Sequence, residues 1–308
     1  MKMFLKWTIP ALLAVSAFGQ DRVATINCDW IDEVRHRPVP ARIYDPPTGD
    51  GPVPVIIFSH GLGGTRNGYE YLGRHWAGHG YVSVHIQHEG SDDAVWRGSR
   101  QPFKAMQRAA FDPANAINRP KDVSFAIDQM ERINREAGPL QGRLDLDHIG
   151  VAGHSFGAYT TLASVGQSIS RSRTLADPRI RAAIPMSAPV PDRPGVKLDN
   201  VYRQINVPVF HMTGTHDDSP IGNTSPKQRR LPFDHGAGRP CYLLILKDAD
   251  HMAFADHGAA NYHELICAGS TAFWDAYLKD DAPARVWLAE GGFKDALGDY
   301  GTLEVKNP

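Results

Sequence analysis

The sequence predicts an α/β fold in which one domain is built on a mainly parallel central sheet, with helices on both faces and an N-terminal antiparallel hairpin. Three observations predict this class. Apolar, β-branched runs alternate with helical patterns over most of the 308 residues, two long polar segments each follow a predicted strand, and no internal repeat or long linker divides the chain. Strands that alternate with helices need crossover connections, which give a parallel sheet covered on both faces.

The predicted elements follow one another in a regular order. Residues 23–44 alternate around 35–38 in the manner of an antiparallel hairpin. The helical spacing of apolar residues predicts a helix over 121–137, ended by a Gly-Pro pair, and a last helix over about 259–278. Buried strands are predicted at 53–59, 81–86, 148–152, 180–186, 207–212 and 242–246.

Two stretches, 87–120 and 218–240, fit neither pattern. Both are long and polar, with many Gly, Pro, Arg and Asp residues, and each follows a predicted strand. We therefore expect both to leave the sheet at its carboxyl edge, where open α/β sheets bind ligands.

Composition and charge exclude several classes of protein. A hydrophobic content of 42% is that of a globular domain and excludes a disordered chain. The 33 Lys and Arg residues against 34 Asp and Glu give a net charge of −1, so no basic excess points to nucleic acid or to an anionic membrane surface.

The N-terminus predicts a signal peptide over residues 1–19. Lys2 and Lys6 precede an apolar stretch, 7–18, that is too short to span a bilayer. We expect cleavage before Gln20, a domain over 20–308, a secreted or periplasmic protein, and no stable membrane insertion afterwards. An exported chain can form a disulfide, but an odd number of cysteines leaves one unpaired and buried free thiols are favoured; the three are Cys28, Cys241 and Cys267.

Residues 153–157, Gly-His-Ser-Phe-Gly, carry the strongest chemical signal. The predicted strand 148–152 runs directly into them, and 158–163 has a helical composition. A G-x-S-x-G motif between a strand and a helix is the setting of a nucleophile elbow, where a tight turn lifts a serine hydroxyl above the sheet. We therefore predict Ser155 as a nucleophile.

A serine nucleophile needs a base that is itself oriented by an acid, in the chain order Ser, acid, His. Asp217 follows the strand 207–212 and is the predicted acid, with Asp218 as the alternative. His251 follows the strand 242–246 and is the predicted base. His216 would demand a different acid because it directly precedes Asp217, and His257 and His263 lie further toward the last helix.

Two backbone amides are predicted to bind the oxyanion of a tetrahedral intermediate. Phe156 follows the nucleophile, and its N–H is one donor. Leu62 lies in the glycine-rich stretch His-Gly-Leu-Gly-Gly at 60–64, after the strand 53–59, and its N–H is the other. The Leu62 and Phe156 side chains, together with Trp96, are also predicted to contact substrate.

The motifs HGLGG, GHSFG and DADHMAFAD, in this order, resemble the α/β-hydrolase superfamily. The sequence is most similar to secreted bacterial serine esterases of the dienelactone-hydrolase-like and platelet-activating-factor acetylhydrolase-like group, with cutinase-like polyester hydrolases as neighbours. The resemblance covers about residues 40–280 and implies the same triad and oxyanion donors. Dienelactone hydrolases themselves use a cysteine nucleophile, so Ser155 favours ordinary esters.

The resemblance implies hydrolysis of a small-molecule or polymeric carboxylic ester through an acyl-enzyme. We expect a small or medium acyl group, because segments 87–120 and 218–240 show no amphipathic lid helix of the kind an interfacial lipase needs. Several alternatives stay open: a polyester hydrolase, a phospholipid acetylhydrolase, a peptidase, a thioesterase, an acyltransferase and a non-catalytic binding protein of this fold. We expect no metal, because the histidine and aspartate spacings fit no zinc or calcium motif, and no organic cofactor.

Overall fold

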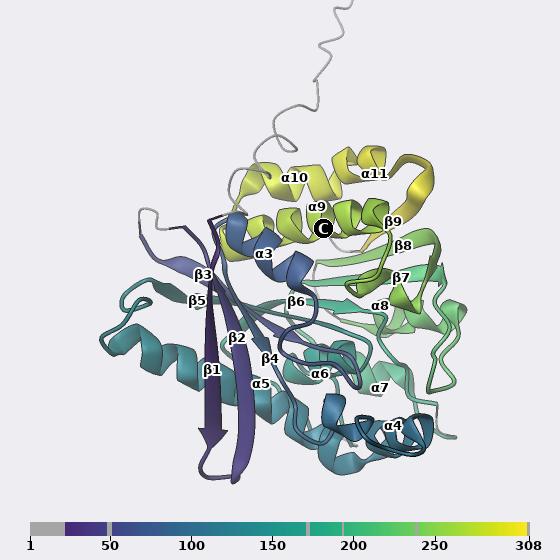
Figure 1. The fold of residues 1–308 in the computed structure, drawn as a ribbon. Helices are drawn as coiled ribbons and strands as arrows, with labels where there is room; N and C mark the ends of the chain where they lie inside the picture. The colour runs from purple at the N-terminus through teal and green to yellow at the C-terminus, as the bar shows by residue number, and fades with distance from the viewer. Residues whose placement is uncertain (1–21, 48–50, 171–172, 193, 238–239, 307–308) are drawn as a thin grey trace, which may run out of the picture.

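The computed structural model describes residues 22–47, 51–170, 173–192, 194–237 and 240–306. The predicted signal peptide, 1–19, lies outside these residues. Figure 1 shows one α/β domain with a central sheet between two layers of helices, as the sequence predicts.

The described residues form a nine-stranded sheet in the order β1-β2-β4-β3-β5-β6-β7-β8-β9. All neighbours from β4 to β8 in this order pair in parallel, whereas β1, β2 and β9 are joined antiparallel. The strands are β1 (Ala24–Asp32), β2 (Arg37–Asp45), β3 (Val53–Ser59), β4 (Val82–Ile86), β5 (Leu144–His154), β6 (Ile180–Met186), β7 (Val209–His216), β8 (Cys241–Asp250) and β9 (Gly301–Lys306).

The predicted N-terminal hairpin is confirmed, since β1 pairs antiparallel with β2 over the whole of both strands. Strand β2 then pairs antiparallel with β4, so the hairpin extends the sheet instead of standing apart from it. Strand β9 was not predicted. It pairs antiparallel with β8 and closes the opposite edge of the sheet.

Helices cover both faces of the sheet, and each face has its own hydrophobic core. The helices are α3 (Glu70–Gly78), α4 (Pro102–Phe111), α5 (Pro113–Arg135), α6 (Phe156–Ser164), α7 (Leu198–Tyr202), α8 (Leu231–His235), α9 (Ala260–Leu278), α10 (Ala282–Ala289) and α11 (Gly292–Leu297). Helices α5 to α8 pack their buried residues against one face. Helices α3 and α9 to α11 pack theirs against the other, at the top of Figure 1.

The polar segments 87–120 and 218–240 contain helices, which corrects their description as irregular. The first holds the short helix η1 (Asp93–Val95), α4 and the start of α5; the second holds η2 (Pro226–Arg230) and α8. Prolines that suggest loops in the sequence stand instead in the first turns of α4, α5, η2 and α8. Proline suits the first turn of a helix because that position needs no N–H donor.

Helix α5 begins at Pro113 and not near residue 121, so Pro120 lies inside it. A proline inside a helix leaves the carbonyl four residues earlier without its usual N–H donor. Here the hydroxyl of Tyr159, from α6, donates to the carbonyl of Ala116 over 3.4 Å. This tertiary contact replaces the missing bond and explains how the helix continues through Pro120.

All three cysteines are free thiols; Cys241 and Cys267 are buried and Cys28 is half-buried. Within the described part of the chain, no helix combines the length and the apolar character needed to cross a bilayer. In that same part, no three His, Cys, Asp or Glu side chains are grouped so that they could hold a metal ion.

Candidate active site

Ser155 occupies a strained turn between β5 and α6. Its backbone has φ 57° and ψ −116°, in a region that a residue with a side chain rarely adopts. The glycines on either side are required by close packing. A Cβ atom at Gly157 would lie 1.9 Å from the carbonyl oxygen of Ser59, and one at Gly153 would lie 2.4 Å from that of Gly157. The G-x-S-x-G spacing therefore produces the strand–turn–helix geometry expected of a nucleophile elbow.

The structure brings Ser155, His251 and Asp217 together at the carboxyl edge of the sheet. His251 begins the short helix η3 (His251–Phe254) directly after β8, and Asp217 follows β7. His251 Nε2 lies 2.9 Å from Ser155 Oγ, and His251 Nδ1 lies 2.7 Å from Asp217 Oδ1. The alternative acid, Asp218, is exposed, whereas Asp217 is fully buried.

The hydrogen bonds determine which nitrogen of His251 carries the proton. An ionised carboxylate only accepts, so Nδ1–H donates to Asp217 and the lone pair of Nε2 faces the serine hydroxyl. Burial raises the pKa of Asp217, but the hydrogen bond from His251 and the charge of Arg229 outweigh it and lower the pKa overall. Thr213 Oγ1 also donates to this carboxylate, over 2.7 Å.

Arg229, in η2, was not predicted and lies directly beside the His251–Asp217 pair. Its Nη1 donates to the carbonyl of Ser187 over 2.7 Å, and its Nε donates to the carbonyl of Asp217 over 3.2 Å. Its Nη2 is 3.4 Å from Asp217 Oδ1 and 3.3 Å from His251 Nδ1. Since guanidinium and Nδ1–H are both donors, the carboxylate is the partner of Nη2 and the contact with His251 is not a hydrogen bond.

His154, the residue before the nucleophile, contacts the backbone of His251. His154 Nε2 lies 2.9 Å from the carbonyl oxygen of His251, and Nδ1 lies 2.7 Å from the hydroxyl of Tyr69. A carbonyl only accepts, so Nε2–H is the donor and Nδ1 accepts from Tyr69. Burial and the neighbouring His251 lower the pKa of His154 well below its usual range, so the ring is neutral.

The loop after β3 lies against the elbow. A Cβ atom at Gly61 would be 3.5 Å from both the Nδ1 atom and the carbonyl oxygen of His154, which places this loop next to Ser155. Among the described residues, the amides of Leu62 and Phe156 have no hydrogen-bond acceptor. Both predicted oxyanion donors therefore have an N–H that no described residue uses.

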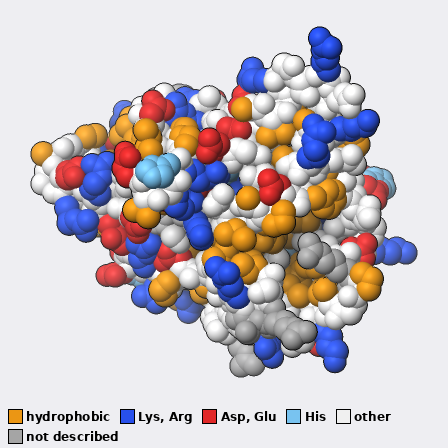
Figure 2. All heavy atoms as spheres, turned by 90° about the horizontal axis from the view of Figure 1, so that it is seen from below, with side chains coloured by type: hydrophobic (Ala, Val, Ile, Leu, Met, Phe, Trp, Pro, Cys, Tyr) orange, Lys and Arg blue, Asp and Glu red, His pale blue; other side chains and the backbone are white. Residues whose placement is uncertain are grey.

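The third predicted contact residue, Trp96, packs against this loop. Its Nε1 donates to the carbonyl of Gly63 over 2.8 Å, and 37% of the residue is exposed. Helix α4 follows nearby in the chain and exposes Phe103 and Phe111 beside Lys104 and Arg108. Figure 2, seen from below, shows hydrophobic side chains gathered on this face with Lys and Arg side chains around them. Segment 87–120 therefore contains a helix whose exposed side chains are both aromatic and basic.

Comparisons with known proteins agree with the resemblance. The profile of the family described as "Platelet-activating factor acetylhydrolase, isoform II" matches residues 35–110, which include the glycine-rich loop at 60–64. Platelet-activating factor acetylhydrolases of dog (Canis lupus familiaris) and cattle (Bos taurus) are each 24% identical to this chain, over 66% of the chain and 48% of the relative. That of guinea pig (Cavia porcellus) is also 24% identical, over 85% of the chain and 66% of the relative.

The chain resembles the platelet-activating factor acetylhydrolases. The predicted similarity to platelet-activating-factor acetylhydrolase-like members of the α/β-hydrolase superfamily is thereby confirmed, and the sheet order and elbow give the fold of that superfamily. The chain spans about half the length of the dog and cattle relatives that it matches.

Proposed function

We propose that this protein is a serine hydrolase that cleaves carboxylic esters through Ser155, His251 and Asp217. The observation that carries the proposal is the hydrogen-bonded series in which His251 lies 2.9 Å from Ser155 Oγ and 2.7 Å from Asp217 Oδ1. This series supplies a nucleophile, a base and an orienting acid in the order that the fold requires.

In the proposed first half-reaction, Ser155 Oγ attacks the ester carbonyl carbon while His251 Nε2 takes the hydroxyl proton. The electron pair of the carbonyl bond moves to its oxygen, which accepts hydrogen bonds from the Leu62 and Phe156 amides. The tetrahedral intermediate collapses, the alcohol leaves with the proton from His251, and an acyl-enzyme remains.

In the second half-reaction, water attacks the acyl carbon and gives a proton to His251. Collapse of the second tetrahedral intermediate releases the carboxylic acid and returns the proton to Ser155 Oγ. Asp217 keeps the imidazole in the required tautomer throughout, since its carboxylate accepts from Nδ1–H. The reaction needs no group beyond the protein, the ester and water.

The proposed substrate is an ester of a small or medium acyl group. The relatives are named for an acetyl group, which is the two-carbon acyl, and this supports a short acyl chain. A phospholipid that carries such a group is the more specific candidate. The exposed Phe103 and Phe111, with Lys104 and Arg108 on the same helix, suit contact with an amphiphile that has an anionic phosphate.

The test is a series of p-nitrophenyl esters from acetate to palmitate, run beside a short-acyl phospholipid and an emulsified long-chain triglyceride. We expect the highest kcat/KM with a short acyl chain, and loss of turnover in Ser155→Ala while its circular dichroism is unchanged. A non-catalytic binding protein would hydrolyse none of these esters. Highest activity on emulsified triglyceride would contradict the proposed substrate class.

We also propose that residues 1–19 direct export and are removed, so that the mature domain is 20–308. This proposal is supported by Lys2 and Lys6 ahead of the apolar stretch 7–18. Mass spectrometry of protein recovered from the periplasm or medium of an expressing bacterium should give a chain that begins at Gln20. A chain that keeps residue 1 and stays in the cytoplasm would contradict it.

A further inference from the structure

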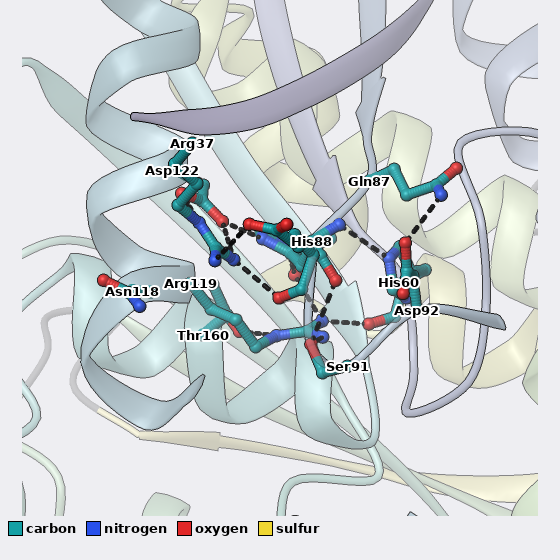
Figure 3. A network of polar contacts seen from close by, with 12 residues as sticks. Arg37, His60, Gln87, His88, Ser91, Asp92, Asn118, Arg119, Asp122 and Thr160 are labelled. Carbon is teal, nitrogen blue, oxygen red and sulfur yellow. Dashed lines mark hydrogen bonds and ion pairs between the residues drawn. The ribbon is translucent and has the colours of Figure 1, made fainter. Parts of the chain in front are cut away.

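A buried guanidinium lies at the centre of a polar network beside the elbow (Figure 3). Arg119, from α5, is fully buried. Its Nε donates to Thr160 Oγ1 over 2.9 Å, and its Nη1 donates to Ser91 Oγ over 2.8 Å. Its Nη2 donates to Ser59 Oγ over 3.0 Å and to the carbonyl of His60. All four acceptors are neutral, so this charge has no carboxylate in direct contact.

These contacts join the two halves of the predicted oxyanion site. Ser59 and His60 end β3 and begin the loop that carries Leu62. Thr160 lies one turn into α6, and its hydroxyl donates to the carbonyl of Phe156 over 2.9 Å. The guanidinium carbon also lies 4.6 Å from the centre of the Phe156 ring. The Arg119 side chain therefore contacts the loop that carries the Leu62 amide and also contacts Phe156, whose amide is the second predicted donor.

His60 fixes the direction of the Leu62 amide. Its Nδ1 donates to the carbonyl of Gly61 over 2.6 Å, while its Nε2 accepts from the backbone N–H of His88 over 3.1 Å. The Gly61 carbonyl and the Leu62 N–H belong to one planar peptide unit. The hydrogen bond that orients the Gly61 carbonyl therefore also orients the Leu62 N–H. Burial and the charge of Arg119 lower the pKa of His60 well below its usual range, so the ring stays neutral and keeps this tautomer.

The network continues away from the elbow and reaches a buried carboxylate. Ser59 Oγ, which accepts from Arg119, lies 2.8 Å from His88 Nε2 and donates to it. His88 Nδ1–H donates to Asp122 over 2.9 Å, and Asp122 also accepts from Arg37 over 2.9 and 3.0 Å. Asp122, which also pairs with Arg35, is thus separated from Arg119 by Ser59 and His88, and the Arg119 guanidinium donates to the neutral acceptors of the elbow and the loop.

We propose that Arg119 is a positioning residue that sets the spacing and direction of the Leu62 and Phe156 amides toward the oxyanion; this inference rests on the proposed ester hydrolysis. Oxyanion donors act because they are held in place before the charge develops. A planar guanidinium fork holds several acceptors in one geometry, and a lysine ammonium on a flexible stem does not.

The experiment compares Arg119→Met and Arg119→Lys with a matched control, Arg179→Met. Arg179 also contacts α5, through Asp128 and Glu131, but it directly precedes β6 and so lies at the amino ends of the parallel strands, away from the carboxyl edge that holds Ser155. The measurements are kcat and KM on p-nitrophenyl acetate and the inhibition constant of a trifluoromethyl ketone. This ketone forms a tetrahedral oxyanion on a serine nucleophile and so reports on the oxyanion site.

For Arg119→Met we expect kcat to fall about 100-fold and ketone binding to weaken by about the same factor, with KM within about threefold of wild type. Arg119→Lys should lose about tenfold in kcat, because it keeps the charge but not the fork. Arg179→Met should keep wild-type kcat. A kcat of Arg119→Met within about threefold of wild type would overturn the inference, as would a fall in kcat with unchanged ketone binding.

Two milder variants decide the question if the Arg119 variants do not fold. Thr160→Val and Ser91→Ala each remove one acceptor of Arg119 and should each lower kcat and ketone binding about threefold to tenfold. Unchanged values in both would overturn the inference. A wild-type protein that neither hydrolyses the ester nor binds the ketone would overturn the proposed function as well, whereas an active wild type with equally active variants would overturn only the role of Arg119.

Discussion

Two buried arginines flank the proposed reaction centre, and the chain holds them in different ways. Arg229 lies beside the Asp217 carboxylate and the His251 ring. Arg119 lies behind the loop of Leu62 and the ring of Phe156, and its acceptors are hydroxyl and carbonyl oxygens. Both guanidinium groups have a pKa lowered by burial, and that of Arg119 falls to about 9, so both carry a charge at neutral pH.

The difference indicates that the two arginines have different roles in the proposed active site. On the triad side, the charge of Arg229 is matched by a carboxylate in contact, so it serves to keep Asp217 ionised and oriented. On the oxyanion side, Arg119 contacts no carboxylate among the described residues, and its hydrogen bonds go to the loop after β3 and to α6. We expect the two sides to respond differently to substitution.

The largest effect is expected from Asp217→Asn. The amide would donate to Nδ1 or leave it in the wrong tautomer, and kcat should fall about 10⁴-fold. Asp218→Asn is the matched control, because the two aspartates are adjacent and Asp218 is exposed; its kcat should stay within about threefold of wild type. The reverse ranking in ester kinetics would mean that Asp218 is the acid.

The next effect is expected from Arg229→Met, through stability. This change leaves the Asp217 carboxylate buried without its cation, and breaking a buried pair in this way costs about 3 kcal/mol. Urea unfolding should show that loss in the free energy of unfolding. A change below about 0.5 kcal/mol would show that His251 and Thr213 alone compensate the carboxylate.

Acid should act on His88 and on Asp217 in separate pH ranges. Burial and the charge of Arg119 lower the pKa of His88 in the folded protein to about 3. In the unfolded chain the pKa of a histidine is near 6.5, so between these two values the unfolded chain binds more protons than the folded protein. Its contribution to stability is present above about pH 6.5 and falls by about 1.4 kcal/mol per pH unit below it. The contribution of Asp217 is lost only below about pH 3.8, because its folded pKa is lowered from that value.

The measurement is the free energy of unfolding from urea titrations between pH 7 and pH 4. We expect the free energy of unfolding to fall steadily below about pH 6.5. In His88→Asn this dependence on pH should be weaker, by the contribution of about one proton. A free energy that is flat over this range would contradict the buried, neutral state of His88.

The smallest effect is expected from Tyr69→Phe. The hydroxyl holds Nδ1 of His154, whose Nε2–H in turn holds the carbonyl of His251. Loss of one neutral hydrogen bond is worth about 1 kcal/mol, so kcat/KM should fall about fivefold. Unchanged kinetics would show that the backbone of His251 is held without this bond.

The features that can be predicted from the sequence are those that depend on residues close together along the chain. The elbow follows from Gly153, Ser155 and Gly157 because small residues are needed wherever the turn approaches other backbone. The mainly parallel sheet follows from the alternation of strands and helices. The same reasoning expects Asp217 and His251 at one edge, since each follows a strand of the parallel sheet. It predicts Asp217 as the acid but leaves Asp218 as an alternative, because the pattern of the strand does not fix which of two adjacent side chains turns inward.

Other parts of the site depend on contacts between distant residues. Arg119 and His60 are separated by 59 positions and Arg229 and His251 by 22, and nothing in the local pattern marks either arginine as buried. Both lie in segments that look like solvated loops because they are rich in charge and proline. Pro120 is a similar case, since only the hydroxyl of Tyr159 from another helix explains why α5 continues through it.

The most direct test of the account is to treat the protein with a fluorophosphonate and map the modified residue by mass spectrometry. We expect a single adduct on Ser155 in the wild type, a much slower reaction in His251→Ala and Asp217→Asn, and no adduct in Ser155→Ala. A wild-type protein that stays unmodified, or one that is modified at another residue while Ser155 stays free, would contradict the account.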